Sequence, residues 1–283
     1  MRNVSYQAFV SEYRGHAGKL AAEICAMDDN DICLVAVGGD GTANEVINGI
    51  TDFEKVRFGV IPTGSGNDLA RGLSLSKDPK NGAIHILNAM KKSREDTWCM
   101  DLGEVNFGEK KRLFAISAGI GLDALVCKKA LKSTIKDILN KIRLGKLTYL
   151  VLTVQSLFTM QTADAEIFFD REEGLQKKRM IFTAAMNFKA EGGGVPMAPA
   201  ASACDGKLSF CEAAGIPKWR TFLCLPFLVA AKHTSIHGFS VTDAKDCTIR
   251  LSRPMVVHAD GEYCGEVTEV HFHCLPGKLR VLK

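Results

Sequence analysis

The stretch Ile32-Cys-Leu-Val-Ala-Val-Gly-Gly-Asp-Gly-Thr42 decides the fold class of this chain. Its first six residues are an unbroken apolar run, as in a parallel strand that is buried on both faces. The loop Gly38–Gly41 ends the strand, and a helical pattern runs from Thr42 to Ile50. Because Thr42 and Glu45 have the spacing of a capping box, we expect the helix to begin at Thr42. Strand, glycine loop and helix in this order predict an α/β domain.

A second unit of the same kind follows directly. Phe58–Ile61 has a strand pattern, Pro62–Gly66 forms a glycine-rich turn, and Asn67 begins another helical pattern. Successive units of this type build a mainly parallel sheet, and their loops meet at the carboxyl ends of the strands, where open α/β sheets bind ligands. A further helix is expected from Asp78 to Met90.

The pattern changes after Trp98, where short strand-like segments recur to the end of the chain. Helical patterns interrupt them only from Leu122 to about Phe158 and from Pro217 to Ala231. We therefore predict two domains, an α/β domain at 1–103 and a β-dominated domain with a helical insertion at 104–283. The C-terminal tail is expected to pack back on the first domain.

Composition narrows the class of protein. The longest apolar stretch, Thr221–Ala231, contains Pro226 and is far shorter than the roughly 20 residues of a membrane span. No secretory pattern opens the sequence, and none of the ten cysteines forms a CxxC pair, so we expect a reduced, cytoplasmic protein. The formal charge of +4 is too small to indicate nucleic-acid binding.

Basic residues are concentrated between Lys128 and Lys146, where seven cations accompany one acid, Asp137. This run is either a solvated helix face or a surface that attracts anionic lipid. With the apolar helical pattern of Leu144–Met160 behind it, we expect peripheral membrane contact here.

Asp40 suggests that the first glycine loop binds a phosphate through a metal ion. Glycines at a helix N-terminus let backbone N–H groups approach a phosphate, but a carboxylate in the same loop repels phosphate unless a divalent cation lies between them. The alternative is a tight structural turn. Asp260-Gly261-Glu262 places two carboxylates across a glycine, which is also a common hairpin turn. The Gly192–Pro199 loop is either a flexible linker or a lip or metal-binding loop of the second domain.

In their order along the chain these motifs resemble the diacylglycerol kinase catalytic-domain family. The resemblance rests on GGDGT-x-NE at Gly38–Glu45, G-S-G-N-D at Gly64–Asp68, Asp-Leu-Gly at Asp101–Gly103, the triple-glycine loop at Gly192–Pro199 and the late DGE at Asp260–Glu262. It covers nearly the whole chain and is shared with sphingosine and ceramide kinases, and more distantly with NAD kinases. It implies a Rossmann-like α/β domain followed by a β-sandwich, with ATP in the cleft between them. It also implies Mg²⁺-dependent transfer of phosphate to a lipid hydroxyl, diacylglycerol first among the candidates.

The resemblance assigns roles residue by residue. Glu262 matches a proposed general base with Asp260 beside it, although Asp40 fills that role in some accounts of related enzymes. The positions that match nucleotide-binding residues are Gly38, Gly39, Asp40, Gly41, Thr42, Asn44, Glu45, Thr63, Gly64, Ser65, Gly66 and Asn67. The positions that match metal-site residues are Asp40, Asp68 and Asp101 for the nucleotide-site Mg²⁺, and Ser202, Asp205 and the Lys207 carbonyl for a structural Mg²⁺.

The start of the sequence departs from the family pattern. Family members usually carry a strand and an Asn-Pro-x-[Ser/Ala]-Gly loop before the segment matched by Ser11–Ala17, and this sequence begins at the strand that follows. Two alternatives to a lipid kinase stay open. One is a nucleotide kinase of the NAD kinase type, which shares GGDGT, and the other is a non-catalytic nucleotide- or lipid-binding relative that lacks the usual first strand and its loop. The sequence leaves the lipid undefined and is compatible with a homodimer.

Overall fold

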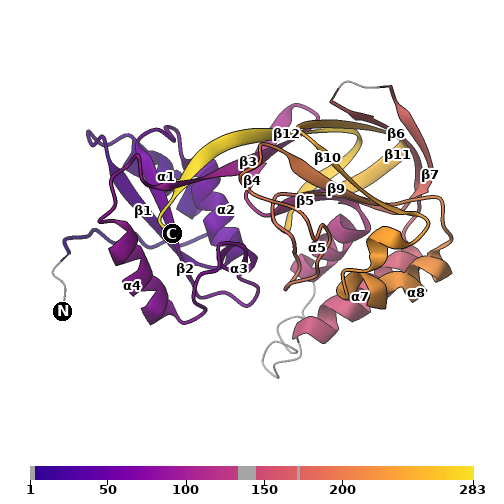
Figure 1. The fold of residues 1–283 in the computed structure, drawn as a ribbon, viewed down its shortest axis with the longest axis horizontal. Coiled ribbons are helices and arrows are strands. Elements are labelled where there is room, and N and C mark those ends of the chain that lie inside the picture. Colours follow the sequence, from indigo (N-terminus) through magenta and orange to yellow (C-terminus); the bar gives the residue numbers. More distant parts are fainter. Residues whose placement is uncertain (1–3, 133–144, 171–172) are drawn as a thin grey trace.

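The structure, a computed structural model, describes residues 4–132, 145–170 and 173–283. Figure 1 shows an α/β part that contains the N-terminus beside a larger part rich in strands. The α/β part is formed by α1 (His16–Cys25), β1 (Ile32–Gly38), α2 (Asp40–Gly49), β2 (Val56–Pro62), α3 (Asp68–Gly72) and α4 (Pro79–Ala89).

The two predicted strand–loop–helix units lie side by side. β1 and β2 pair in parallel from Ile32 opposite Val56 to Gly38 opposite Pro62. Their glycine loops therefore leave the sheet at the same edge, as the sequence predicted.

The predicted capping box is wrong. Helix α2 begins at Asp40, two residues before Thr42, and no side chain caps its first turn. The Glu45 carboxylate instead accepts a hydrogen bond from the backbone N–H of Gly15, at 2.8 Å. A tertiary contact thus takes the side chain that the local pattern assigned to the cap.

The β-rich part surrounds a second core. Its strands are β3 (Trp98–Phe107), β4 (Lys110–Phe114), β5 (Ser117–Gly121), β6 (Ala163–Phe169), β7 (Leu175–Met180), β8 (Phe182–Met186), β9 (Leu208–Ala213), β10 (Phe239–Ala244), β11 (Asp246–Ala259) and β12 (Glu262–Val281). Its helices are α5 (Leu122–Lys132), α7 (Gly145–Thr159), α8 (Lys218–Val229) and the short 3₁₀ helix η1 (His233–Ser235).

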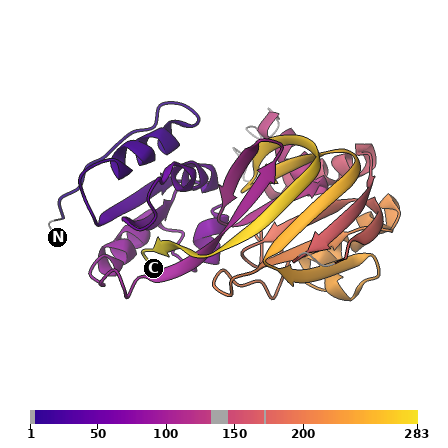
Figure 2. The same ribbon diagram turned by 90° about the horizontal axis from the view of Figure 1, so that it is seen from above.

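Strand β12 joins the two parts. It pairs antiparallel with β11 and β3, and its last residues pair in parallel with β2, Val281 opposite Phe58. Its register with β3 shifts between Leu275 and Leu279, where the strand crosses from one part to the other. Figure 2 shows β12 crossing from the β-rich part to the C-terminus beside the N-terminal sheet.

Each part has its own hydrophobic core. Ile47, Phe58 and Met100 are fully buried in the first, and Phe210 and Phe272 in the second. This confirms the predicted fold class, an α/β part with parallel strands followed by a β-rich part with helices inserted. The boundary at residue 103 stays a prediction, because β3 runs through it without a break.

In the described part of the chain, no helix has the length and apolar character needed to cross a membrane.

Candidate functional site

The two glycine loops touch each other through their backbones. The Thr63 N–H donates to the Gly38 carbonyl at 2.9 Å. A Cβ added to Gly64 would lie 2.6 Å from the Cα of Gly39, closer than real Cβ contacts allow. Only glycine permits this approach, and the result is a single rim of backbone at the N-terminus of α2.

Side chains predicted to bind the nucleotide hold this rim in place. The Asn67 amide both accepts from the Gly64 N–H at 3.0 Å and donates to the Gly64 carbonyl at 2.7 Å. Thr42 packs directly over Gly38, where an added Cβ would meet its side chain. Thr63 and Ser65 are exposed at the rim.

Asp40 and Asp68 both lie close to Gly66. A Cβ on Gly66 would lie 3.0 Å from Oδ2 of Asp40 and 3.9 Å from Oδ2 of Asp68. The other Asp40 oxygen accepts from the Leu69 N–H at 3.0 Å. Burial raises the pKa of Asp40, although this hydrogen bond opposes the shift. The structure therefore brings these two predicted carboxylates together beside the glycine rim.

Asp68 also connects the two parts of the molecule. It forms an ion pair with Arg71, and its Oδ2 accepts from the Gly193 N–H at 3.0 Å. Gly193 belongs to the triple-glycine loop of the β-rich part. That loop is thus a lip of this site, one of the two alternatives that the sequence left open.

Glu262 reaches the same rim from the far end of the chain. It is the first residue of β12, and a Cβ added to Gly41 would lie 3.3 Å from its Oε1. Its carboxylate forms an ion pair with Arg14, and 18% of its side chain is exposed. Asp40, Asp68 and Glu262, which lie far apart in the sequence, are therefore positioned around one pair of loops.

Asp260 was predicted to be a catalytic residue beside the base Glu262, but its carboxylate makes structural hydrogen bonds. It is buried in the hairpin turn between β11 and β12, with a positive φ of 47°. Oδ1 accepts from the backbone N–H groups of Ile116 and Ser117 at 2.8 and 3.0 Å; Oδ2 accepts from Ala115 N–H at 2.8 Å and from the amide of Asn44 at 2.9 Å. Each carboxylate oxygen has two acceptor sites, so both are filled and none is left for a proton in transit.

Asn44 was predicted near the nucleotide and is fully buried. Its amide donates to Asp260 and to the Leu113 carbonyl, while its oxygen accepts from Arg112. In this structure Asn44 anchors α2 to the hairpin turn that carries Glu262, and its place near the nucleotide stays a prediction.

Asp101 was predicted to share a metal with Asp40 and Asp68, and that role stays a prediction; the described partners of its carboxylate are backbone N–H groups. Its two oxygens accept from the backbone N–H groups of Gly206 and Gly277, both at 2.7 Å. Gly277 lies in the register shift of β12, and Gly206 lies beside Asp205. The physical reason is burial, because only 2% of Asp101 is exposed and backbone donors satisfy its charge there.

The segment predicted as a structural metal site is therefore joined to Asp101. The Lys207 N–H donates to Asp205 at 3.1 Å, and the backbone N–H of Asp101 donates to the Ala203 carbonyl at 2.7 Å. Ser202 is exposed in the same segment. The metal role of Ser202, Asp205 and Lys207 stays a prediction.

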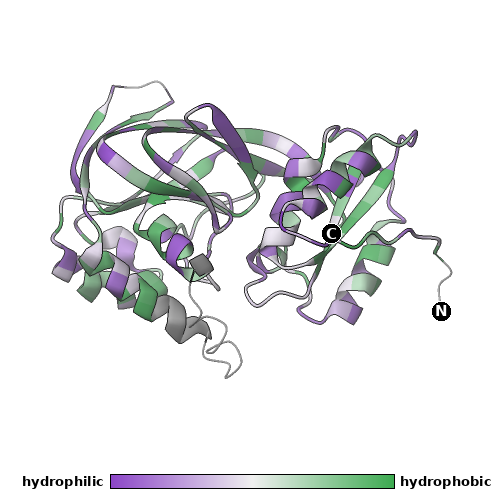
Figure 3. Ribbon diagram, turned by 180° about the vertical axis from the view of Figure 1, so that it is seen from behind, coloured by the Kyte–Doolittle hydropathy of each residue, from purple (hydrophilic) through white to green (hydrophobic). Residues whose placement is uncertain are grey.

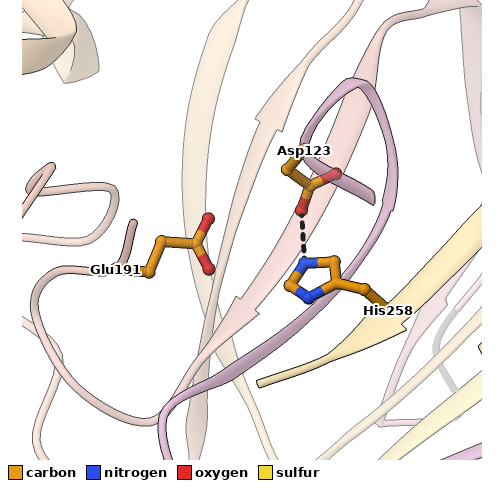
Figure 4. Close-up of side chains that lie close together, drawn as sticks. All are labelled: Asp123, Glu191 and His258. Carbon is orange, nitrogen blue, oxygen red and sulfur yellow. Dashed lines mark hydrogen bonds and ion pairs between the residues drawn. The ribbon is translucent and has the colours of Figure 1, made fainter. Parts of the chain in front are cut away.

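No sequence motif predicted a second group of ionisable residues, which consists of Asp123, Glu191 and His258. Figure 4 shows them pointing toward one another, and their possible ligand atoms lie within 4.8 Å of each other. His258 Nε2 lies 3.0 Å from Asp123, His258 Nδ1 accepts from the Gly261 N–H at 3.2 Å, and the Ser117 hydroxyl donates to Glu191. Because both ring nitrogens have protein partners, this group braces the hairpin turn and needs no metal to do so.

Two family models match this chain, one over each part of the fold. Residues 1–100 match the family model described as diacylglycerol kinase catalytic domain, and residues 117–283 match the one described as YegS C-terminal NAD kinase beta sandwich-like domain. A Bacillus subtilis protein, YtlR, named as a candidate lipid kinase, is 30% identical over 99% of this chain and 90% of its own length. The chain belongs to the diacylglycerol kinase catalytic-domain family.

Other members of the family agree with this placement. The diacylglycerol kinase of Bacillus subtilis is 28% identical over 87% of this chain and 75% of its own length. The crystal structure of a candidate diacylglycerol kinase from Bacillus anthracis, 22% identical, covers 96% of this chain and 84% of its own with a TM-score of 0.74, which supports the fold. The sequence-based resemblance to a lipid kinase family is thereby confirmed.

Proposed function

We propose that this member of the diacylglycerol kinase family transfers the γ-phosphate of ATP to the hydroxyl of a membrane lipid, diacylglycerol being the first candidate. The observation that carries the proposal is the arrangement at the glycine rim. Two backbone loops meet there, with Asp40 and Asp68 beside Gly66 and Glu262 against Gly41. Phosphate binding, metal binding and base catalysis thus have candidate groups at one place.

The rim suits the phosphates of ATP. Its N–H groups lie at the N-terminus of α2, where the helix dipole favours negative charge. Side chains at Gly39 or Gly64 would separate the loops, so the backbone itself offers the donors. We expect the loops to position the phosphate chain for in-line transfer.

The carboxylates beside the rim suit Mg²⁺. Asp40 and Asp68 each direct an oxygen toward Gly66, and carboxylate oxygens are the ligands that Mg²⁺ prefers. Bound there, the ion would neutralise charge on the phosphates, which Asp40 alone would repel. Asp40 is therefore the first candidate ligand, and Asp68 and Asp101, whose oxygens also accept from backbone N–H groups, stay predicted ligands of the ion.

Glu262 is the residue proposed to accept the proton of the lipid hydroxyl. It is partly exposed, so an acceptor could reach it, and the buried Asp260 fixes the turn that carries it. The exposed Arg14 forms an ion pair with its carboxylate, and we expect an incoming acceptor to displace this cation.

The lipid requires a membrane surface, and the predicted peripheral contact on α7 belongs to this proposal. Part of the basic run that supported it, including Lys136, Lys141 and Arg143, lies outside the described residues. Cytoplasmic location, the absence of a nucleic-acid partner and a homodimer stay predictions.

The test is phosphate transfer from labelled ATP to diacylglycerol in detergent micelles, with phosphatidic acid as the expected product. Glu262→Gln should lower kcat by about 10²–10⁴-fold while ATP still binds. Glu266→Gln is the matched control, because Glu266 lies on the same strand and pairs with Lys128 at 2.6 Å.

Three other results would count against the proposal. Turnover of Glu262→Gln close to that of the wild type would remove Glu262 from the role of base. Transfer to NAD in place of the lipid would favour a nucleotide kinase, in line with the shared GGDGT motif. Thermal stabilisation by ATP with no transfer to any acceptor would indicate a non-catalytic relative.

A further inference from the structure

Helix α8 is apolar on the side that faces solvent as well as on the side that faces the core. Thr221, Cys224 and Leu228 are buried. The opposite face is exposed, and its large apolar residues are Trp219, Phe222, Leu223, Phe227 and Val229. Trp219 is 60% exposed, Leu223 57% and Val229 65%. A surface helix normally carries polar residues on its outer face, so this face is suited to a partner.

Helix α7 extends the same surface. Phe158, 52% exposed, lies beside Phe222 with 6.1 Å between the ring centroids, and Val151 is also exposed. Figure 1 shows α7 and α8 side by side at one end of the β-rich part, and Figure 3 shows hydrophobic residues along both. We call the exposed apolar residues of α7 and α8 the apolar face.

Cations border the apolar face where α7 ends. Lys129 Nζ donates to the Thr159 hydroxyl at 3.1 Å, Lys218 donates to the Met160 carbonyl, and Arg253 donates to the Gln161 side chain. The sequence from 213 to 242 contains no Asp or Glu, whereas it contains Lys218, Arg220 and Lys232. Nearby Glu266 is already paired with Lys128. The border of the face is therefore positively charged.

We propose that the apolar face docks on an anionic lipid bilayer, with α8 lying in the plane of the headgroups. An apolar helix face with aromatic residues and flanking cations is the pattern of an interfacial helix. A second copy of this chain is a poorer occupant, because a two-fold contact through this face would bring the same cations opposite one another. The proposal rests on the proposed function for its purpose, since docking would present the lipid substrate. The docking itself requires no catalysis.

Trp219 offers a direct test, because the chain contains only two tryptophans, Trp98 and Trp219. In a Trp98→Phe background, Trp219 fluorescence is measured with phosphatidylcholine–phosphatidylglycerol vesicles whose acyl chains are brominated, without ATP. We expect a blue shift and quenching that are weaker with phosphatidylcholine alone.

Variants then locate the contact. Phe222→Ser with Phe227→Ser should weaken vesicle binding, measured by co-sedimentation, by about tenfold or more. Ile84→Ser is the matched control, because Ile84 is 47% exposed on α4 in the other part of the molecule. Both variants change exposed side chains, and thermal melting checks that they fold.

Two outcomes would overturn the docking. One is an unshifted, unquenched Trp219 in vesicles, or binding that the double variant leaves unchanged. The other is a dimer in sedimentation velocity without lipid that the double variant abolishes, which would identify a second copy as the occupant. Transfer to a short-chain diacylglycerol in solution separates the two proposals, because it should persist in the double variant even if docking is lost.

Discussion

Asp260→Ala should destabilise the fold far more than a substitution at the adjacent candidate base. The Asp260 carboxylate accepts four hydrogen bonds, three from the backbone N–H groups of residues 115–117 and one from the amide of Asn44. Alanine would leave all four donors without this partner in a buried site. An unsatisfied buried donor costs about 1–3 kcal/mol.

The expected loss of stability follows from these four hydrogen bonds, reduced because the surrounding structure can relax. Because neighbouring losses are not additive, we expect about 4 kcal/mol from the four donors together. In a chain of this size that corresponds to a fall in Tm of about 10 °C. The Tm of Asp260→Asn should lie between that of the wild type and that of Asp260→Ala. Its side-chain oxygen can still accept two of the hydrogen bonds, while its NH₂ group faces the other donors.

Thermal melting and urea unfolding measure the effect, and Glu262→Gln is the comparison. Glu262 is partly exposed and paired with the exposed Arg14, so its substitution should change the free energy of unfolding by less than about 1 kcal/mol. If Asp260→Ala melts within about 2 °C of the wild type, the structural role of Asp260 is refuted. If Glu262→Gln loses as much stability as Asp260→Ala, the division between the two carboxylates is wrong.

Three further predictions test other contacts. Gly64→Ala should weaken ATP binding in calorimetry and lower stability by about 1–3 kcal/mol, because its Cβ would lie 2.6 Å from the Cα of Gly39; unchanged affinity would contradict the joined rim. Asp101→Ala should lower the urea midpoint equally with and without Mg²⁺, because the carboxylate binds backbone N–H groups; a loss seen only with Mg²⁺ would support its predicted metal role. Burial raises the pKa of Cys264 to about 11 and that of Cys274 to about 12, so in the folded protein at pH 8 neither should react with an aromatic disulfide reagent, and reaction before unfolding would contradict this. The fast-reacting thiols should be the two exposed ones, Cys99 and Cys204.

Local sequence was informative wherever one segment determined its own structure. The apolar run Ile32–Val37, the glycine loop after it and the repeat of this unit at Phe58 predicted parallel strands with adjoining loops, and the structure contains them. The Asp260-Gly261 turn could also be predicted from the sequence, because few residues other than glycine and aspartate tolerate its positive φ angles. The motifs that place the chain in its family lie on these elements.

Side-chain partners were predicted less well, because they come from segments distant in the sequence. Glu45 looked like a helix cap and bonds to Gly15, and Asp101 looked like a metal ligand and bonds to Gly277. A buried carboxylate needs hydrogen-bond donors, and any backbone that the fold brings near can supply them.

The sequence by itself determined the class of fold, the glycine loops and the family. Only the tertiary structure decided which acids share a place: β12 carries Glu262 to Gly41, while Asp260 and Asp101 are bonded elsewhere. It also decided that α8 exposes an apolar face, which its composition could not distinguish from a buried helix. The physical reason is the range of the interactions, since strand and turn propensities act over a few neighbouring residues, whereas burial depends on contacts across the whole chain.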